Sequence, residues 1–150
     1  MRGGSLVDDP YDLQRFVEAQ DRTGGYERAL GEIRSGTKET HWIWWIFPQL
    51  AGLGLSSTSR EYSISSLAEA EAYFRHPVLG SRLREVTAAM NGHSGLTASS
   101  ILHRDDVKFR SSMTLFMRAA PTEPLFRDAI DTFFNAEPDA RTDELLERHV

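Results

Sequence analysis

The amino-acid sequence predicts an all-α fold, a compact multihelical single domain of about seven to nine mostly short helices. The first observation behind this prediction is composition: the chain has 29 leucine and alanine residues but only 12 valine and isoleucine residues. Leucine and alanine keep their conformational freedom in a helix, whereas β-branched side chains lose rotamers there. The second observation is spacing, because most apolar residues recur three or four positions apart, as on one helix face.

Length and composition limit the class of protein. A chain of 150 residues fits one domain of ordinary size. We expect residues 1–8 to form a disordered N-terminal arm and residues 9–150 to form a single helical domain. The chain has no cysteine, which excludes disulfides, thiolate metal sites and a cysteine nucleophile.

Location and partners follow from hydropathy and charge. The longest apolar run is residues 42–47, whereas a membrane-spanning helix needs about 20 residues. The first residues lack the apolar region of a signal peptide, so we expect a cytoplasmic protein with no membrane partner. The formal net charge of -5 argues against general nucleic-acid binding.

Caps and glycines mark the first two helices. Asp9 followed by Pro10 predicts the start of a first helix. The glycine pair at 24–25 ends it. A second helix is expected over residues 26–35, because Gly36 suits the left-handed conformation that ends many helices.

All three tryptophans lie in one short segment, residues 42–47. Thr40 is a candidate N-cap for a short helix here, and Pro48 must end it. A strand fits the same aromatic run, because periodicity does not separate the two at this length. Both assignments stay open for this segment, and residues 49–55 are expected to form a glycine-containing loop.

Further caps predict the helices of the second half. Ser66 and Glu69 match a capping box, in which the serine hydroxyl and the glutamate carboxylate each accept a backbone N–H at the helix start. Thr97 is a candidate cap for a short helix, and Asp105 or Asp106 begins a stronger one. The expected helical segments are 56–62, 66–75, 77–91, 97–102, 105–120, 122–133 and 143–148.

The tryptophan segment has two interpretations. In one, the rings are core anchors around which the helices pack, since each ring buries a large apolar area. In the other, the rings that do not face the core line a pocket together with His41 and Gln49. In either case we expect fewer than half of the side chains of residues 42–47 to be exposed.

The segment 105–116 combines an apolar face with a separate polar stripe. Lys108 lies on that stripe together with Ser111 and Ser112. The chain has 15 arginines but only two lysines, so Lys108 is a candidate for a site that needs a compact ammonium group. The alternative is a solvated stripe that carries an accidental lysine.

The candidate site is a small-molecule pocket formed by residues 41–49 and 108–114. We assign His41 as the candidate catalytic residue, because imidazole exchanges a proton near neutral pH. The candidate ligand-binding residues offer stacking faces and donors for a small anion such as a nucleotide: Trp42, Gln49, Lys108, Arg110, Ser111 and Ser112. The sequence indicates no cofactor and no metal site, since no two of the five histidines are four positions apart.

A second interpretation is a non-catalytic helical protein-interaction module, in which the tryptophan cluster is purely structural. Both interpretations stay open at the level of the sequence, as do catalysis, the identity of the ligand and the oligomeric state.

Four stretches of the chain carry a resemblance to a known family. They are HWIWWIFPQLAGLG at 41–54, YSISSLAEAEAY at 62–73, HPVLG at 76–80 and KFRSSMTLF at 108–116. In order and spacing they resemble the "domain of unknown function 1810" family of bacterial proteins. Trp45 departs from the pattern, which usually has another aromatic residue there. The resemblance implies a multihelical single domain, in agreement with the helical prediction, and implies no activity.

Overall fold

The computed structural model describes residues 8–23 and 25–148. Within these ranges the chain forms ten α-helices and one turn of 3-10 helix, without any strand, which confirms the all-α prediction. Apart from Asp8, the N-terminal arm expected at residues 1–8 lies outside the described residues. No helix of the described ranges is long and apolar enough to cross a bilayer.

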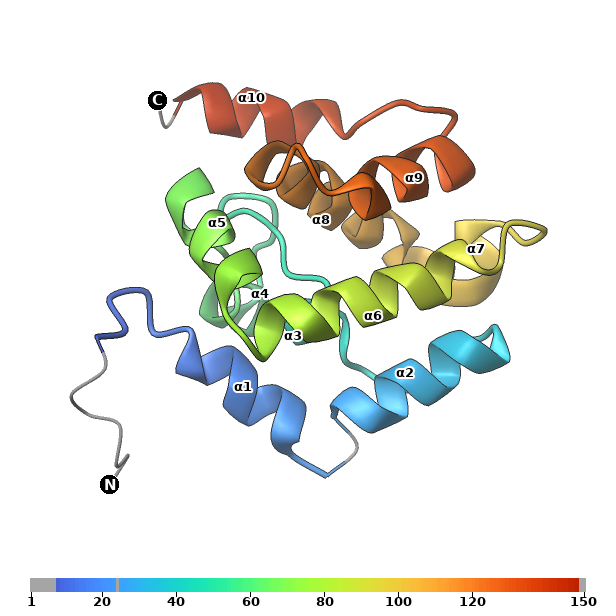
Figure 1. Ribbon diagram of the computed structural model, residues 1–150, viewed down its shortest axis with the longest axis horizontal. Helices are drawn as coiled ribbons and strands as arrows, with labels where there is room; N and C mark the ends of the chain where they lie inside the picture. Colours follow the sequence, from blue (N-terminus) through green and yellow to red (C-terminus); the bar gives the residue numbers. More distant parts are fainter. Residues whose placement is uncertain (1–7, 24, 149–150) are drawn as a thin grey trace.

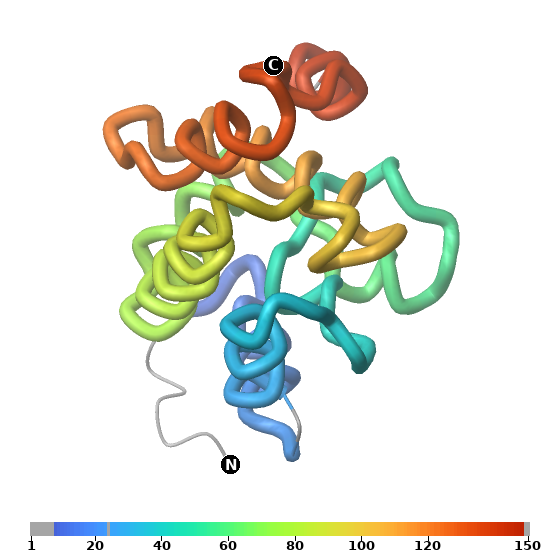
Figure 2. Tube along the Cα trace, turned by 90° about the vertical axis from the view of Figure 1, so that its right-hand side faces the viewer, coloured from blue at the N-terminus to red at the C-terminus, as the bar shows by residue number. Residues whose placement is uncertain are grey.

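The helices are short and follow one another closely. In chain order they are α1 (Gln14–Asp21), α2 (Tyr26–Ser35), α3 (Ile43–Ile46), α4 (Ser57–Glu61), α5 (Leu67–Arg75), α6 (Leu79–Asn91), α7 (Ala98–Leu102), the 3-10 turn η1 (His103–Asp105), α8 (Asp106–Ala119), α9 (Pro124–Phe133) and α10 (Ala140–Arg148). Figure 1 shows α9 and α10 above α8, α6 running across the middle, and α1 and α2 along the lower edge. The chain between α2 and α5, cyan to green, occupies the right-hand side of Figure 2.

Helix α8 is the centre of the core. It packs against α5, α9, α10 and α7, and residues 111–117 are all buried. The Phe109 ring lies 4.8 Å from Phe47, and the Phe116 ring lies 5.3 Å from Tyr73, between ring centres. The helix is therefore buried on nearly all sides, whereas the sequence pattern predicts a separate polar stripe.

Several predicted boundaries are confirmed. Gly36 ends α2 in the left-handed conformation, with φ of 89°. Thr97 accepts a backbone N–H as the predicted cap of α7, and Ser56, the first residue of the expected segment 56–62, does the same for α4. Residues 43–46 form a helix, which decides between the helix and the strand for the tryptophan segment.

Three predicted helix starts are wrong in detail. Asp9 followed by Pro10 does not begin α1, which starts at Gln14, although the Asp9 carboxylate accepts the N–H groups of Leu13 and Gln14. Thr40 does not cap α3, because its hydroxyl donates to the buried Glu32 carboxylate at 2.7 Å. Ser66 accepts the Glu69 N–H, as predicted for α5. The Glu69 carboxylate, however, accepts the N–H and the hydroxyl of Ser65, one residue earlier than a capping box requires.

Candidate functional site

The tryptophan segment is divided between the core and the surface. Four of its six side chains, including that of Trp42, are buried, whereas Trp44 and Trp45 are half-buried. This confirms the prediction that fewer than half of these side chains are exposed. Only one of the three tryptophans belongs to the buried core, and the other two line pockets.

Trp42 is held by a buried carboxylate. Glu32 of α2 accepts four hydrogen bonds of 2.7 to 3.0 Å. They come from the Glu39 N–H, the Thr40 N–H and hydroxyl, and the Trp42 indole N–H. Burial alone would raise the pKa of the Glu32 carboxyl, but these bonds favour its charged form and hold the pKa at about 2. Trp42 is predicted to bind a ligand. Its ring is buried instead, and its indole N–H is bonded to this carboxylate.

The His41 pocket, the larger cavity beside this segment, has a volume of about 430 Å³. Its walls come from the end of α1 and the turn that follows, from the chain before α3, from α3 and from α4. The polar and aromatic side chains that line it are Arg22, Thr23, His41, Trp45, Thr58, Glu61 and Tyr62. His41 itself is exposed, so the pocket is open to solvent at the predicted catalytic residue.

Arg22 forms one wall of the His41 pocket. Its guanidinium donates to the Tyr62 hydroxyl at 3.1 Å and lies 5.5 Å from the centre of the Trp45 ring. The Trp45 and Tyr62 rings pack edge to face, 5.3 Å apart. The three side chains orient one another, and they place a positive charge at the pocket.

A buried amide fixes α3 beside this pocket. The Gln20 side chain donates to the Trp45 carbonyl at 2.7 Å and to the Tyr73 hydroxyl at 3.2 Å. Arg82 donates to the Gln20 carbonyl oxygen at 3.2 Å. One turn of helix has little stability alone, so these tertiary bonds hold Trp45 in position.

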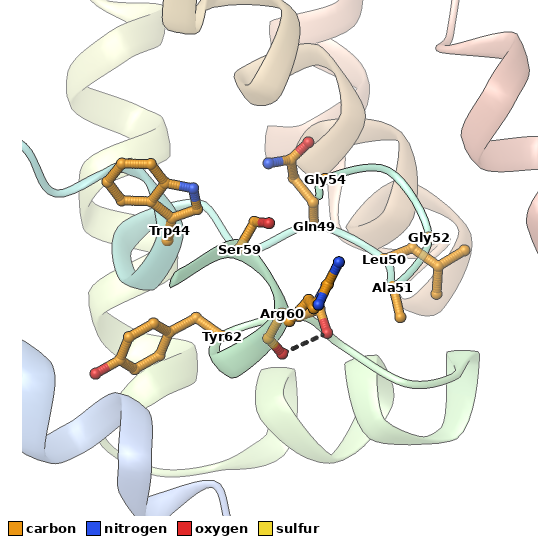
Figure 3. A pocket seen from close by; sticks show the side chains of 10 residues that line it. Trp44, Gln49, Leu50, Ala51, Gly52, Gly54, Ser59, Arg60 and Tyr62 are labelled. Atoms are coloured by element: carbon orange, nitrogen blue, oxygen red, sulfur yellow. Dashed lines mark hydrogen bonds between the residues drawn. The ribbon is translucent and has the colours of Figure 1, made fainter. Parts of the chain in front are cut away.

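The Gln49 pocket is smaller, about 80 Å³, and is drawn in Figure 3. The tryptophan segment and the glycine loop contribute Trp44, Gln49, Leu50, Ala51, Gly52 and Gly54 to its lining, and α4 with the chain after it contributes Ser59, Arg60, Tyr62 and Ser63. A Cβ atom at Gly54 would lie 2.5 Å from Ser59 Oγ. Residues 49–55 thus form the glycine-containing loop expected from the sequence, and Gly54 permits the close approach of α4 to it.

Helix α4 separates the two pockets. Thr58 and Glu61 line the His41 pocket, whereas Ser59 and Arg60 line the Gln49 pocket. Tyr62, directly after the helix, lines both. Every residue of α4 is at least partly exposed, so the helix is a thin wall and not a part of the core.

Arg15 of α1 fixes the C-terminal end of this wall. Its guanidinium donates to the carbonyl oxygens of Glu61 and Ser63, at 2.8 Å each. It also forms an ion pair of 3.1 Å with the buried Glu69 carboxylate. The planar guanidinium thereby orients the chain that leaves α4.

The segment that contains α4 is closed at its base. The Ala51 N–H donates to the Ile64 carbonyl at 2.7 Å, and the Ile64 N–H donates to the Gln49 carbonyl at 2.8 Å. These bonds form an isolated parallel bridge between Leu50 and Ile64. Residues 51–63 therefore form a loop whose two ends meet at one point, and Tyr62 anchors it to the core.

The predicted ligand-binding residues of α8 line neither pocket. Ser112 has no exposed surface. Arg110 donates to the Glu137 carbonyl at 2.9 Å, and the Ser111 hydroxyl donates to the Val107 carbonyl at 3.1 Å. The buried Ser112 hydroxyl has no hydrogen-bond partner among the described residues. Because α8 is buried on nearly all sides, its two serines are not presented to a ligand.

The predicted site is thus divided among three places. His41 lines the larger pocket, Gln49 lines the smaller one, and Lys108 lies at the start of α8 outside both. The two pockets share Tyr62 and the wall formed by α4, so His41 and Gln49 belong to neighbouring sites.

The two lysines of the chain meet at one carboxylate. The Asp105 oxygens lie 3.0 Å from Lys38 Nζ and 3.0 Å from Lys108 Nζ. Lys38 is buried and also donates to the Thr40 carbonyl at 2.6 Å. Burial raises the pKa of Asp105, but the two ammonium groups outweigh it and lower the pKa below its ordinary value. Lys108 therefore belongs to an ion cluster that joins the chain before α3 to the start of α8.

Asp105→Asn is expected to lower the free energy of unfolding by about 2–4 kcal/mol, because the buried Lys38 ammonium loses its carboxylate. Urea unfolding at pH 7 measures this loss. The matched control is Asp106→Asn, since the Asp106 side chain has one described hydrogen bond, from the Val107 N–H. That variant should cost less than about 1 kcal/mol. Equal losses in the two variants would contradict the structural role of the cluster.

In the part of the chain that the structure describes, no group of three or more histidine, aspartate or glutamate side chains is arranged to hold a metal ion.

Comparison with known proteins places the chain in a family. The family described as "Protein of unknown function (DUF1810)" matches residues 10–146. The chain belongs to this family. The conserved hypothetical protein Rv1873 from Mycobacterium tuberculosis, known from a crystal structure, is 44% identical, with a TM-score of 0.89 over 93% of this chain and 99% of that chain. No curated protein matches the chain.

Membership of the DUF1810 family confirms the resemblance that the sequence shows. The most specific stretch, residues 41–54, supplies His41 and Trp45 to one pocket and six residues to the other. Sequence reasoning missed Arg22 and Glu61, because they lie on other helices and no local spacing connects them to His41. Tyr62 could have been found from the sequence, because it is the first residue of the second stretch that resembles the family.

Proposed function

We propose that this protein binds a small anionic ligand in the His41 pocket, and that a phosphate ester of nucleotide size is the ligand class that fits best. One observation carries the proposal: a single open pocket combines the guanidinium of Arg22, the imidazole of His41 and the carboxylate of Glu61. Its volume of about 430 Å³ lies within the range of about 300–1,000 Å³ that is usual for small-molecule sites.

Arg22 is the group that we assign to the anion. A guanidinium has five donors in a fixed plane, and one described hydrogen bond, to Tyr62, engages it. Its stacking on Trp45 reduces the motion that it would lose when a ligand binds. Two donors toward one phosphate or carboxylate group give the short, charge-assisted bonds that bind such groups most strongly.

His41 and Glu61 suit the rest of such a ligand. A carboxylate accepts hydrogen bonds from hydroxyl or amino groups, which a nucleoside or sugar phosphate carries beside its phosphate. Histidine is the side chain that most often serves as a general acid or base, so we assign to His41 the proton transfer of any reaction at this site.

The interaction-module interpretation requires a tryptophan cluster that is purely structural. Trp42 fits that role, because it is buried and bonded to Glu32. Trp44 and Trp45 do not fit it, since each lines a pocket. This difference within the cluster favours a ligand-binding protein.

The test is a fluorescence titration of the Trp44→Phe variant with 5′-nucleotides and sugar phosphates. In this variant Trp45 is the emitter at the His41 pocket, so a bound ligand is expected to change the emission. Arg22→Gln should weaken binding at least tenfold, because a hydrogen bond to a charged group contributes about 1.5–3 kcal/mol. Arg28→Gln is the matched control: Arg28 is an exposed arginine of the neighbouring helix α2, outside the pocket lining.

The control should bind as tightly as the unmodified protein. If no compound of the panel changed the tryptophan emission, the proposal would be contradicted. Equal loss of affinity in the Arg22 and Arg28 variants would also contradict it, because that result would indicate attraction by net charge and not a site.

A further inference from the structure

We infer that the Gln49 pocket is a second, separate site, and that it takes a tetrahedral oxyanion, namely a phosphate group. The inference does not rest on the function proposed for the His41 pocket, because it uses other donors and another cavity.

The charge of the lining supports an anion. The residues that line the Gln49 pocket include one basic side chain, Arg60, and no acidic one. In a chain of net charge -5, most described arginines near the surface have a carboxylate partner. Among the described ion pairs none involves Arg60, so its charge is available to a ligand.

The hydrogen-bonding groups of the lining support the same conclusion. The described hydrogen bonds leave three kinds of N–H donor at this pocket unused: the Trp44 indole, the Gln49 amide and the Arg60 guanidinium. The hydroxyls are engaged in a different way, because Ser59 donates to the Ser56 carbonyl at 2.8 Å and Ser63 donates to the Arg60 carbonyl at 2.9 Å. The lining groups that are left without a described hydrogen bond thus include several N–H donors, and an oxyanion binds to such donors.

The three donors belong to the lining of one cavity. Figure 3 shows the nitrogen-bearing edge of the Trp44 ring turned toward Ser59 and Gln49. The Arg60 guanidinium lies between α4 and the stretch of Leu50 and Ala51, and the Gln49 amide extends away from it. The three donors come from α4, from the loop and from α3, so an anion bound among them would join three elements of the fold.

The size of the cavity suits a small ligand. The Gln49 pocket, at about 80 Å³, has room for several water molecules and so for one tetrahedral oxyanion. The His41 pocket, at about 430 Å³, is several times larger. Inorganic phosphate and the phosphate of a small ester share the chemistry that the donors recognise, provided that the remainder of the ester stays outside the cavity.

Specific residues and contacts shape the walls of the cavity. Gly54 has no side chain where a Cβ atom would meet Ser59, and Gly52 has φ of 101°, which other residues rarely adopt. The bridge between Leu50 and Ile64 and the Arg15 bonds described above fix the loop and the end of α4. When the loop is closed, the backbone that carries these donors is therefore already in position before an anion binds.

Nuclear magnetic resonance of the three indole N–H groups tests the inference. The full-length protein is titrated with sodium phosphate at constant ionic strength, which sodium chloride maintains. The Trp44 indole signal is expected to shift and to saturate. The Trp42 signal should stay in place, because that N–H is bonded to Glu32. A parallel titration with ribose 5-phosphate shows whether the site takes the phosphate of an ester as well as the free ion.

Variants assign the binding to the pocket. Arg60→Gln should weaken phosphate binding at least tenfold and leave the melting temperature nearly unchanged, since an exposed arginine without an ion pair adds little stability. Gln49→Ala should weaken binding severalfold. Arg75→Gln is the matched control, because Arg75 is exposed and lies outside the pocket lining.

Two outcomes would overturn the inference. One is a Trp44 signal that does not respond to phosphate, or that responds equally in the Arg60→Gln variant. The other is a response confined to Trp45 and abolished by Arg22→Gln. That second result would place the phosphate in the His41 pocket, and the function proposed for that pocket would stand while the present inference failed.

Discussion

Replacing Glu32 with alanine is expected to lower the free energy of unfolding by about 3–5 kcal/mol. The variant leaves four donors without their acceptor, and one of them is the buried indole N–H of Trp42. Each buried donor that loses its partner costs about 1–3 kcal/mol, and neighbouring donors in one network share part of this loss. Urea unfolding followed by circular dichroism measures the change.

The matched control is Glu39→Ala. The Glu39 side chain is exposed, and its described hydrogen bond to Glu32 uses the backbone N–H, which alanine retains. This variant should lose less than about 0.5 kcal/mol. If the two glutamate variants lost equal stability, the network around Glu32 would not be the support that we describe.

The same carboxylate predicts sensitivity to acid. The pKa of Glu32 is about 2 in the folded protein, against an ordinary value of 4.5. Folding therefore favours the charged carboxylate, and this contributes about 3 kcal/mol that is fully present above pH 4.5 and is lost as the pH falls toward 2. Glu32→Gln removes the titrating group, so the variant should lose less stability than the unmodified protein over this pH range.

Trp42→Ala is the second substitution for which we expect a large effect, a loss of about 3–5 kcal/mol. The ring is fully buried, lies 6.3 Å from the Phe47 ring and carries the Lys38 ammonium 5.0 Å from its centre. Alanine would leave a cavity and would remove one donor from Glu32. Chemical denaturation measures the loss.

Trp44→Ala is the control for Trp42→Ala, because the two residues are of the same type and lie two positions apart. Trp44 is half-buried at the wall of the Gln49 pocket, so its removal should cost clearly less, about 1–2 kcal/mol. Equal costs would show that the tryptophan segment acts as one structural unit, against the division between core and pocket described here.

Much of the fold follows from local sequence signals. Gly36, Ser56 and Thr97 mark helix ends and starts where the structure has them, because capping depends on residues close in sequence. The Thr40 cap failed because a more distant group, the Glu32 carboxylate, accepts the same hydroxyl. Competition between a local and a tertiary partner is not visible in the sequence.

The polar stripe of α8 failed for a related reason. The positions of Ser111 and Ser112 look like a solvent face, but α8 is covered by several helices at once. The Ser111 hydroxyl bonds to a backbone carbonyl of the same helix at 3.1 Å, and Thr114, also buried, does so at 2.8 Å. Small hydroxyl residues can be buried in this way at low cost, so they do not reveal which faces are exposed.

The candidate site was predicted in part. His41 and Gln49 both line pockets, as expected, but the pockets are different ones. Trp44 and Trp45 are neighbours in a single turn of helix, where successive side chains point about 100° apart. One ring therefore lines each pocket. The sequence predicts that side chains around this turn line a site. Their division between two pockets depends on the position of α4, which the sequence does not reveal.

The closed loop of residues 51–63 links the two pockets. Every residue of α4 is at least partly exposed, whereas Tyr62 directly after it is buried, so α4 can open at a lower free-energy cost than global unfolding. A ligand in either pocket would contact α4 and so bind its closed position. The first ligand to bind removes the ordering cost that the second would otherwise meet. Two ligands that never touch would in this way bind with positive cooperativity, through the helix that both of them contact.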